Sequence, residues 1–164
     1  MKRTLKKIYL AAALRLVHAA ICELPKLDKK AEEECLSLPT GISYAISTGY
    51  KAPTLFVQWD GSELRRLSEE PQQRCCKLSI KTLADAFILL TGRMSLAHLY
   101  ARHGLIVTGE IADVMHLARL VNLAECYLFP AFITRRILPE LPRLQASPLR
   151  LYARVFFGFL TNRY

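Results

Sequence analysis

Hydrophobic and polar positions recur most regularly between residues 78 and 109, and this stretch predicts four elements in a row. A strand ending near Ile80 is followed by LADAFILL at residues 83–90, which has helical spacing and Asp85 as its single charge. A helix that is apolar on nearly every side is buried, or it covers a cavity. A second helical stretch follows, and LIVT at residues 105–108 predicts a short strand.

Start and stop signals support these elements. Thr82 and Asp85 fit a capping box at the start of the first helix, and Gly92 fits a left-handed cap at its end. Ser95 is a capping residue for the second helix, which ends at Gly104. The sequence therefore predicts two short helices between two strands.

A β-hairpin is expected before this stretch. Residues 54–67 alternate around Asp60–Gly61, a dipeptide typical of tight hairpin turns. Successive side chains of a strand point to opposite faces of the sheet. One face of the first strand is therefore expected to carry Leu55, Val57 and Trp59.

Three further segments flank the hairpin. CCKLSI at residues 75–80 alternates and predicts a strand. Residues 42–50 fit either a strand or a helix. Asp28 can cap a helix with the sequence KKAEEECLSL, in which the acidic run Glu32–Glu34 is expected to be solvated in the first turn.

The N-terminal residues 3–21 predict a basic amphipathic helix, with Lys6, Lys7 and Arg15 on its charged side. Two interpretations stay open: a helix packed on its own domain, or a helix that lies in the headgroup layer of a membrane. A membrane-spanning helix needs about 20 uninterrupted apolar residues, and we expect none in this chain. The apolar side of the helix comprises Leu5, Ile8, Tyr9, Ala12, Leu16 and Ala20.

Two more helices are expected in the last third of the chain. One follows Gly109, and prolines then divide the chain after Phe129 into short pieces. The last helix is expected from Ser147 or Pro148 to Thr161. The helix after Gly109 is expected to bury Ile111, Val114, Met115, Leu117, Ala118 and Val121, opposite Asp113, His116 and Arg119.

The composition is unusually apolar, and the positive charge lies at the two ends of the chain. Hydrophobic residues make up 52% of the sequence, which fits a chain buried throughout, an apolar cavity or a membrane surface. Lys and Arg exceed acids by eight to two in residues 1–30 and by six to one in residues 131–164, whereas residues 31–130 have nine against eleven. Basic ends beside apolar residues fit an anionic membrane. Nucleic acid is not expected, because no aromatic stacking platform accompanies the basic residues.

The sequence contains no catalytic or metal-binding pattern. The five cysteines form no CxxC and are expected to be reduced thiols in a cytosolic protein. His98, His103 and His116 lack metal-ligand spacing, so we assign them structural roles. A Cys–His nucleophile pair stays open, although no local signature supports one. Phosphate-binding loops and nucleophile elbows are absent from the sequence, so we expect neither an enzyme nor a cofactor.

The order of elements resembles the sterol carrier protein 2 (SCP2-like) lipid-binding family. In that family an apolar helix ends in a glycine, and a later glycine-led strand ends in another glycine followed by an acid. Here these landmarks are Gly92, Gly104, Gly109 and Glu110, within about residues 50–123. The bacterial accessory lipid-binding proteins of ubiquinone synthesis share this half of the pattern. The strand sequence SELRRL is more charged than is usual in the family.

The resemblance implies an α/β fold of the α+β type, with a mainly antiparallel sheet of about five strands covered by helices and further amphipathic helices at both ends. We divide the chain into a basic N-terminal flank at 1–40, a lipid-binding core at 41–128 and a basic, aromatic C-terminal flank at 129–164, within one compact domain. The implied function is non-catalytic binding of a lipid, isoprenoid or acyl tail in an apolar cavity, to carry it or present it at a membrane. The alternative is a protein–protein interaction module, or an accessory subunit of an enzyme, with a filled core.

The expected partners are a lipid or other long apolar ligand, an anionic membrane surface, and a protein partner or second copy bound through the C-terminal helix. The expected location is the cytoplasm, with peripheral attachment to a membrane. The cavity is expected to be lined by Val57, Trp59, Leu78, Phe87, Leu90, Met94, Leu99, Tyr100, Leu105, Val107 and Met115. The membrane or partner surface is expected to include Lys6, Lys7, Arg15, Arg150, Tyr152, Arg154, Phe156 and Phe159.

Overall fold

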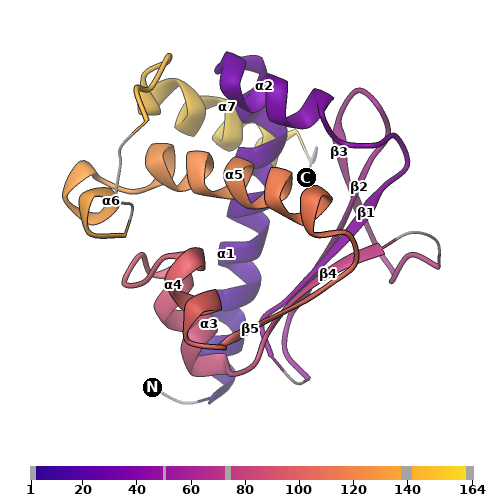
Figure 1. Cartoon of the computed structure of the whole chain (residues 1–164). Helices are drawn as coiled ribbons and strands as arrows, with labels where there is room; N and C mark the ends of the chain where they lie inside the picture. Colours follow the sequence, from indigo (N-terminus) through magenta and orange to yellow (C-terminus); the bar gives the residue numbers. More distant parts are fainter. Residues whose placement is uncertain (1–2, 50, 73–74, 138–141, 162–164) are drawn as a thin grey trace.

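The computed structural model describes residues 3–49, 51–72, 75–137 and 142–161. Within these residues a five-stranded sheet lies on one side of the molecule, and the helices are stacked against one of its faces (Figure 1). The elements in chain order are α1 (Arg3–Glu23), the 3-10 turn η1 (Leu24–Lys26), α2 (Lys29–Leu36), β1 (Ser43–Ser47), β2 (Thr54–Trp59), β3 (Leu64–Leu67), β4 (Cys75–Ile80), α3 (Leu83–Leu90), α4 (Leu96–Ala101), β5 (Leu105–Thr108), α5 (Ile111–Leu128), α6 (Ala131–Ile137) and α7 (Pro148–Leu160).

The sheet has the strand order β3-β2-β1-β4-β5. The pairs β1–β2, β2–β3 and β4–β5 are antiparallel, and β1–β4 is parallel. The predicted fold class, a mainly antiparallel sheet covered by helices, is therefore confirmed, with the refinement that the sheet is mixed. Residues 43–47, where the sequence left strand and helix open, form the central strand β1.

The predicted hairpin is formed by β2 and β3. The Asp60 carboxylate accepts hydrogen bonds from the backbone N–H groups of Ser62 and Glu63, both at 2.8 Å. These bonds lower the pKa of Asp60 to about 2. Because they hold residues 60–63 in the turn, the second strand begins at Leu64, later than the sequence pattern indicates. The side chains that β2 buries are those predicted, Leu55, Val57 and Trp59.

Helices α3 and α4 have the predicted caps. The Thr82 hydroxyl accepts from the Asp85 N–H at 3.0 Å and donates to the Asp85 carboxylate at 2.7 Å. The Ser95 hydroxyl accepts from the His98 N–H at 3.1 Å. Gly92 has φ +68°, the left-handed conformation expected of a helix-ending glycine. Helix α3 is fully buried on one side only, so it lies at the edge of the core.

Helix α1 buries a different side from the one that the sequence predicts. Leu10, Leu14 and Ile21 are buried in the core, whereas Ile8 and Leu16 of the predicted apolar side are exposed. The polar residue His18 is also buried. The prediction was wrong because two sides of this helix are apolar, and packing against α3, α5, α7 and the sheet decides between them. Leu5 and Tyr9 are exposed as well, and Ala20 is the buried member of the predicted side.

The same helix passes the length and composition test for a membrane span. Within Thr4–Lys26 an 18-residue window has a mean hydropathy of 1.4, which makes this helix a candidate span by length and composition. The expectation of no span concerns uninterrupted apolar runs, and Lys6, Lys7 and Arg15 interrupt this segment. A buried core helix passes this test equally well, and 44% of the window is buried inside the protein.

Helix α5 is rotated relative to its predicted orientation. Asp113, expected on the polar side, is buried, whereas Ile111 and Met115 are exposed. The reason is helix α2, which packs on the predicted polar side of α5. There the His116 Nδ1 lies 2.6 Å from a carboxylate oxygen of Glu34. The sequence predicts that Glu34 is solvated in the first turn of α2. In the structure it contacts His116 of α5 instead.

The C-terminal flank packs against the core and contains a helix that the sequence did not predict. Helix α6 begins directly after Pro130, and proline suits the start of a helix. Helix α7 begins at Pro148, as predicted, and it buries Leu151 and Val155. Helix α7 contacts both α1 and α5.

Buried polar contacts attach this flank. Asp28 is buried and accepts a hydrogen bond from the Tyr127 hydroxyl at 2.7 Å. The same hydroxyl accepts from the backbone N–H groups of Gln145 and Ala146, at 3.1 and 3.2 Å. One phenol thus joins the start of α2, the end of α5 and the segment before α7.

We expect Tyr127→Phe to lower the free energy of unfolding by about 1–3 kcal/mol, because it removes a partner from several buried polar groups. Urea denaturation followed by circular dichroism measures this change. Tyr100→Phe removes an exposed hydroxyl on α4 and should change stability by less than about 0.5 kcal/mol. Equal effects of the two substitutions would contradict a role for the Tyr127 hydroxyl in attaching the flank.

Candidate functional site

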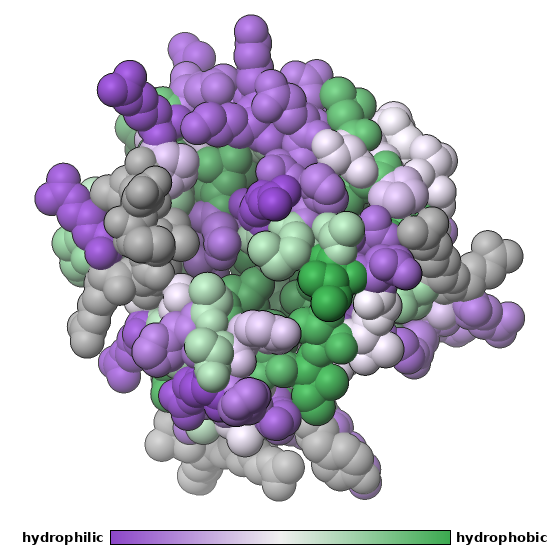
Figure 2. Space-filling view, viewed as in Figure 1, coloured by the Kyte–Doolittle hydropathy of each residue, from purple (hydrophilic) through white to green (hydrophobic). Residues whose placement is uncertain are grey.

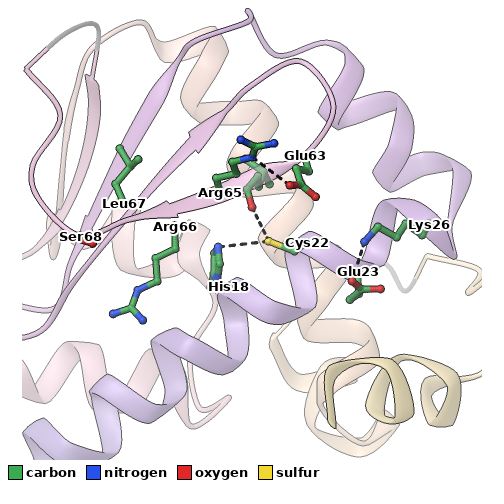
Figure 3. A pocket seen from close by; sticks show the side chains of 10 residues that line it. His18, Cys22, Glu23, Lys26, Glu63, Arg65, Arg66, Leu67 and Ser68 are labelled. Carbon is green, nitrogen blue, oxygen red and sulfur yellow. Dashed lines mark hydrogen bonds and ion pairs between the residues drawn. The ribbon is translucent and has the colours of Figure 1, made fainter. Parts of the chain in front are cut away.

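A hollow of about 610 Å³ lies between α1 and the edge strand β3. Figure 3 shows His18 and Cys22 pointing from α1 toward this strand. Four of the charged residues that line it form ion pairs with each other. Lys26 lies 2.8 Å from Glu23, and Arg65 lies 3.1 Å from Glu63.

The structure brings together one Cys–His pair, with the Cys22 Sγ 3.4 Å from the His18 Nε2. The thiol also donates to the Leu64 carbonyl at 2.8 Å. Burial raises the pKa of Cys22 to about 12 and lowers the pKa of His18 to about 4. Both groups are therefore neutral near pH 7, whereas a nucleophilic cysteine needs a lowered pKa. This geometry does not supply an activated thiolate.

Metal-ligand side chains do not gather either. Among the residues that the structure describes, no group of three His, Cys, Asp or Glu could hold a metal ion. The His116 Nδ1 instead lies 2.6 Å from a carboxylate oxygen of Glu34, between α5 and α2.

A small apolar cavity of about 40 Å³ lies between the sheet and the helices α1, α3, α4 and α5. This volume is close to the roughly 30 Å³ that one water molecule occupies in the liquid. Side chains thus fill most of the space in which we expected a tunnel. The cavity is lined by Leu14, Val17, Ile46, Thr48, Leu78, Ile80, Leu89, Leu90, Leu96, Leu105, Leu117, Ala118, Val121 and Glu125.

An apolar groove of about 250 Å³ adjoins this cavity on the outside. Its size is just below the roughly 300–1,000 Å³ typical of small-molecule sites. The groove and the inner cavity share Val17, Leu90 and Glu125, so the two spaces meet at these side chains. The outer groove is lined by Tyr9, Ala12, Ala13, Leu16, Val17, Leu90, Glu125, Leu128 and Phe129.

Glu125 is the acidic residue at this junction, and it is 5% exposed. Its Oε2 has no hydrogen-bond partner. Burial raises the pKa of the carboxyl to about 8, because the charged form loses its hydration. Near pH 7 the group is therefore mostly protonated, and it can donate a hydrogen bond.

Aromatic and basic groups form the rim of the groove. The Tyr9 hydroxyl donates to the Leu90 carbonyl at 3.1 Å, and the Tyr9 ring lies 5.2 Å from the ring of Phe87. The Lys6 ammonium lies 5.5 Å from the centre of the Phe87 ring, within the range of a cation–π contact. Helix α7 adjoins the groove, because the Tyr152 hydroxyl donates to the carbonyl of Leu128 at 2.5 Å.

Further apolar side chains are exposed on α1, α6 and α7. On the face that carries α5, Figure 2 shows hydrophobic surface in a hollow between α5 and the α3–α4 pair. Phe156 and Phe157 on α7 are 61% and 64% exposed. Isolated exposed apolar residues are ordinary, but a group of them marks an interaction surface. The other large exposed apolar side chains on α1, α6 and α7 are Leu5, Ile8, Tyr9, Leu16, Phe132, Leu149, Tyr152, Phe159 and Leu160.

The predicted lining residues fall into four groups. Tyr100 and Met115 are 58% and 45% exposed and line neither the inner cavity nor the outer groove. Phe87 and Val107 are half-buried against the core. Val57, Trp59, Met94 and Leu99 are buried but line neither space. The inner cavity is lined by the buried Leu78 and Leu105 and by the partly buried Leu90.

The predicted surface residues differ in their contacts. Arg15 and Arg150 are exposed. Lys7 donates to the Lys51 carbonyl at 2.5 Å. Arg154 lies 2.7 Å from the buried carboxylate of Glu23, so its charge is neutralised within the protein.

Sequence reasoning missed Tyr9, Val17 and Glu125 at the groove. A signal for Glu125 was present, since it stands as a lone acid in the otherwise apolar run LAECYL at the end of α5. A lone acid in such a run is buried whenever the helix packs on several sides, as α5 does.

No protein-family model and no curated protein matches the chain. The solved structures that are similar to it include the following two. One is titled "UbiJ-SCP2 Ubiquinone synthesis protein", with 18% sequence identity, a TM-score of 0.49, and coverage of 75% of this chain and 98% of that chain. The other is sterol carrier protein 2 from Yarrowia lipolytica in its apo form, with 10% identity, a TM-score of 0.44, and coverage of 66% and 86%. The titles of both structures name the family that the glycine landmarks indicated.

We expect the unfolding free energy to depend on pH through Glu125. The folded-state pKa of about 8 lies above the unfolded value of 4.5, so stability is fully present below pH 4.5 and is lost as pH rises toward 8. One proton changes the free energy by at most about 1.4 kcal/mol per pH unit. Urea denaturation between pH 5 and 9 should therefore show Glu125→Gln gaining stability relative to the native protein as the pH rises.

Glu110→Gln is the matched control, because it changes an exposed carboxyl at the start of α5. Its stability should follow that of the native protein across this pH range. A Glu125→Gln variant that also follows the native protein would show that Glu125 is ionised in the fold.

Proposed function

We propose that this protein binds one apolar tail, from a lipid or an isoprenoid compound, in the outer groove between α1, α3 and α5, without catalysing a reaction on it. The observation that carries the proposal is the apolar groove of about 250 Å³ that meets an apolar inner cavity. Each CH₂ group moved from water into such a site contributes about 0.8 kcal/mol. Apolar walls with one buried polar group are typical of small-molecule sites.

We expect Ala13→Trp to weaken binding of the neutral fluorophore N-phenyl-1-naphthylamine at least about tenfold, a loss of about 1.4 kcal/mol. Ala13 lines the groove, and an indole placed there would occupy it. The fluorescence increase of the probe on titration measures the affinity. Native mass spectrometry of the purified protein shows in parallel whether a lipid is retained.

Ala97→Trp is the matched control, because it adds the same side chain at an exposed position of α4. It should leave probe binding unchanged. The proposal fails if the native protein neither binds the probe nor retains a lipid, or if both tryptophan variants bind the probe like the native protein.

We further propose that the exposed apolar side chains of α1 and α7 contact an anionic membrane, where the tail is taken up or presented. Phe156 and Phe157 are exposed on α7, near the exposed cation of Arg150. Lys6 adds a positive charge at the rim of the groove. Apolar side chains beside basic ones are the composition of an interfacial membrane surface. In this proposal the protein is a peripheral one of the cytoplasm.

We expect Phe156→Ser combined with Phe157→Ser to reduce binding to vesicles of phosphatidylglycerol and phosphatidylcholine at least about fivefold, since fully burying one Phe contributes roughly 1.5–3 kcal/mol. Vesicle flotation at low and high salt measures binding, and high salt should weaken it for the native protein. Leu36→Ser on α2 alters an equally exposed apolar residue at a site remote from the groove lining, and it should bind like the native protein.

Sedimentation of the same proteins distinguishes a protein partner from a membrane. If the native protein is a stable dimer, ignores the vesicles and becomes monomeric in the double variant, α7 is a protein interface and the membrane proposal is wrong.

A further inference from the structure

Glu125 has a position that packing alone does not require. Its carboxyl lies where the outer groove meets the inner cavity, among apolar side chains that include Val17 and Leu90. Its Oε2 has no hydrogen-bond partner, although the side chain is buried. A buried polar group without a partner is costly, and it is the feature that orients a ligand in an otherwise apolar site.

The other hydroxyl groups that line the two spaces already donate hydrogen bonds. The Thr48 hydroxyl donates to the Pro53 carbonyl at 2.7 Å, and the Tyr9 hydroxyl donates to the Leu90 carbonyl at 3.1 Å. Among the described lining residues, Glu125 is therefore the side chain with a donor to offer when protonated.

The groups around Glu125 carry no charge near pH 7. Tyr9 of α1 lines the groove, and Cys126 follows Glu125 in α5; burial raises the pKa of Tyr9, and raises that of Cys126 to about 11. The linings contain no Lys, Arg or His from α1, α3, α4, α5 or the sheet, within the part of the chain that the structure describes. A neutral Glu125, with its pKa raised to about 8, fits these surroundings.

We propose that Glu125 selects the class of ligand: its protonated carboxyl donates a hydrogen bond to the uncharged oxygen of a lipid that carries a hydroxyl or carbonyl group. This inference rests on the proposed function. The inner cavity of about 40 Å³ has room for a small polar group and not for a tail. The oxygen therefore enters first, and the tail runs outward along the groove of about 250 Å³.

Displacement of N-phenyl-1-naphthylamine by ten-carbon compounds at pH 6.5 tests the inference. The compounds are 1-decanol, 2-decanone, 1-chlorodecane, decanoate and decylamine. We expect Glu125→Leu to weaken 1-decanol and 2-decanone about tenfold and to leave 1-chlorodecane unchanged or tighter. Glu125→Gln keeps a donor and should retain most of the affinity for the alcohol and the ketone. If Glu125→Leu folds poorly, Glu125→Gln still reports through its pH dependence.

The pH dependence gives a second readout. Between pH 6.5 and 9.5 the native protein should lose affinity for 1-decanol as Glu125 ionises, whereas Glu125→Gln should not. Equal changes for 1-decanol and 1-chlorodecane in Glu125→Leu would overturn the inference while the groove still binds the fluorophore. Decylamine that binds the native protein more tightly than 1-decanol would assign a cationic ligand instead. If the native protein binds none of the probes, the proposed function itself fails.

Discussion

The packing of helix α1 is the constraint on which the rest of the structure depends. One side of the helix buries Leu10, Leu14 and Ile21 in the core, and α3, α5 and α7 all contact it. Its opposite side is also apolar, with Ala12 and Leu16, and no element covers it completely. When a helix with two apolar sides packs in a single layer, only one of its apolar sides is buried. The other side faces the solvent and here forms one wall of the groove. The outer groove exists because of this wall.

Two other buried carboxyl groups, Glu23 at the end of α1 and Asp28 before α2, have partners that Glu125 lacks. Glu23 meets Lys26 and Arg154, and Asp28 meets Tyr127. A buried carboxylate must be paired, since an unpaired one loses its hydration without compensation. These pairs attach the C-terminal flank to α1 and α2, so the aromatic surface of α7 has a fixed position. Glu125 lacks such a partner, and its proton takes the place of one.

The parts of the fold that were predictable have local causes. A Thr82–Asp85 capping box and an Asp60–Gly61 turn need only a few neighbouring residues, and both are formed as predicted. The buried sides of α1 and α5 were not predictable in this way. In both helices the apolar pattern allows more than one orientation, and distant elements decide. The orientation of α5 is set by α2, because Glu34 of α2 contacts His116 of α5, which lies 82 residues later in the sequence.

The candidate site was less predictable than the fold, for a related reason. The sequence indicated a tunnel behind α3, but Leu89, Leu105 and their neighbours nearly fill that space and leave about 40 Å³. The larger space lies against α1, at Tyr9 and Leu16, which the sequence pattern places on the apolar side of that helix. On α1, therefore, the wall of the groove and exposed apolar side chains share residues such as Tyr9 and Leu16. Under the proposed function, a tail can pass between membrane and groove along this side without crossing water, and this continuity favours a peripheral lipid-binding protein over a filled interaction module.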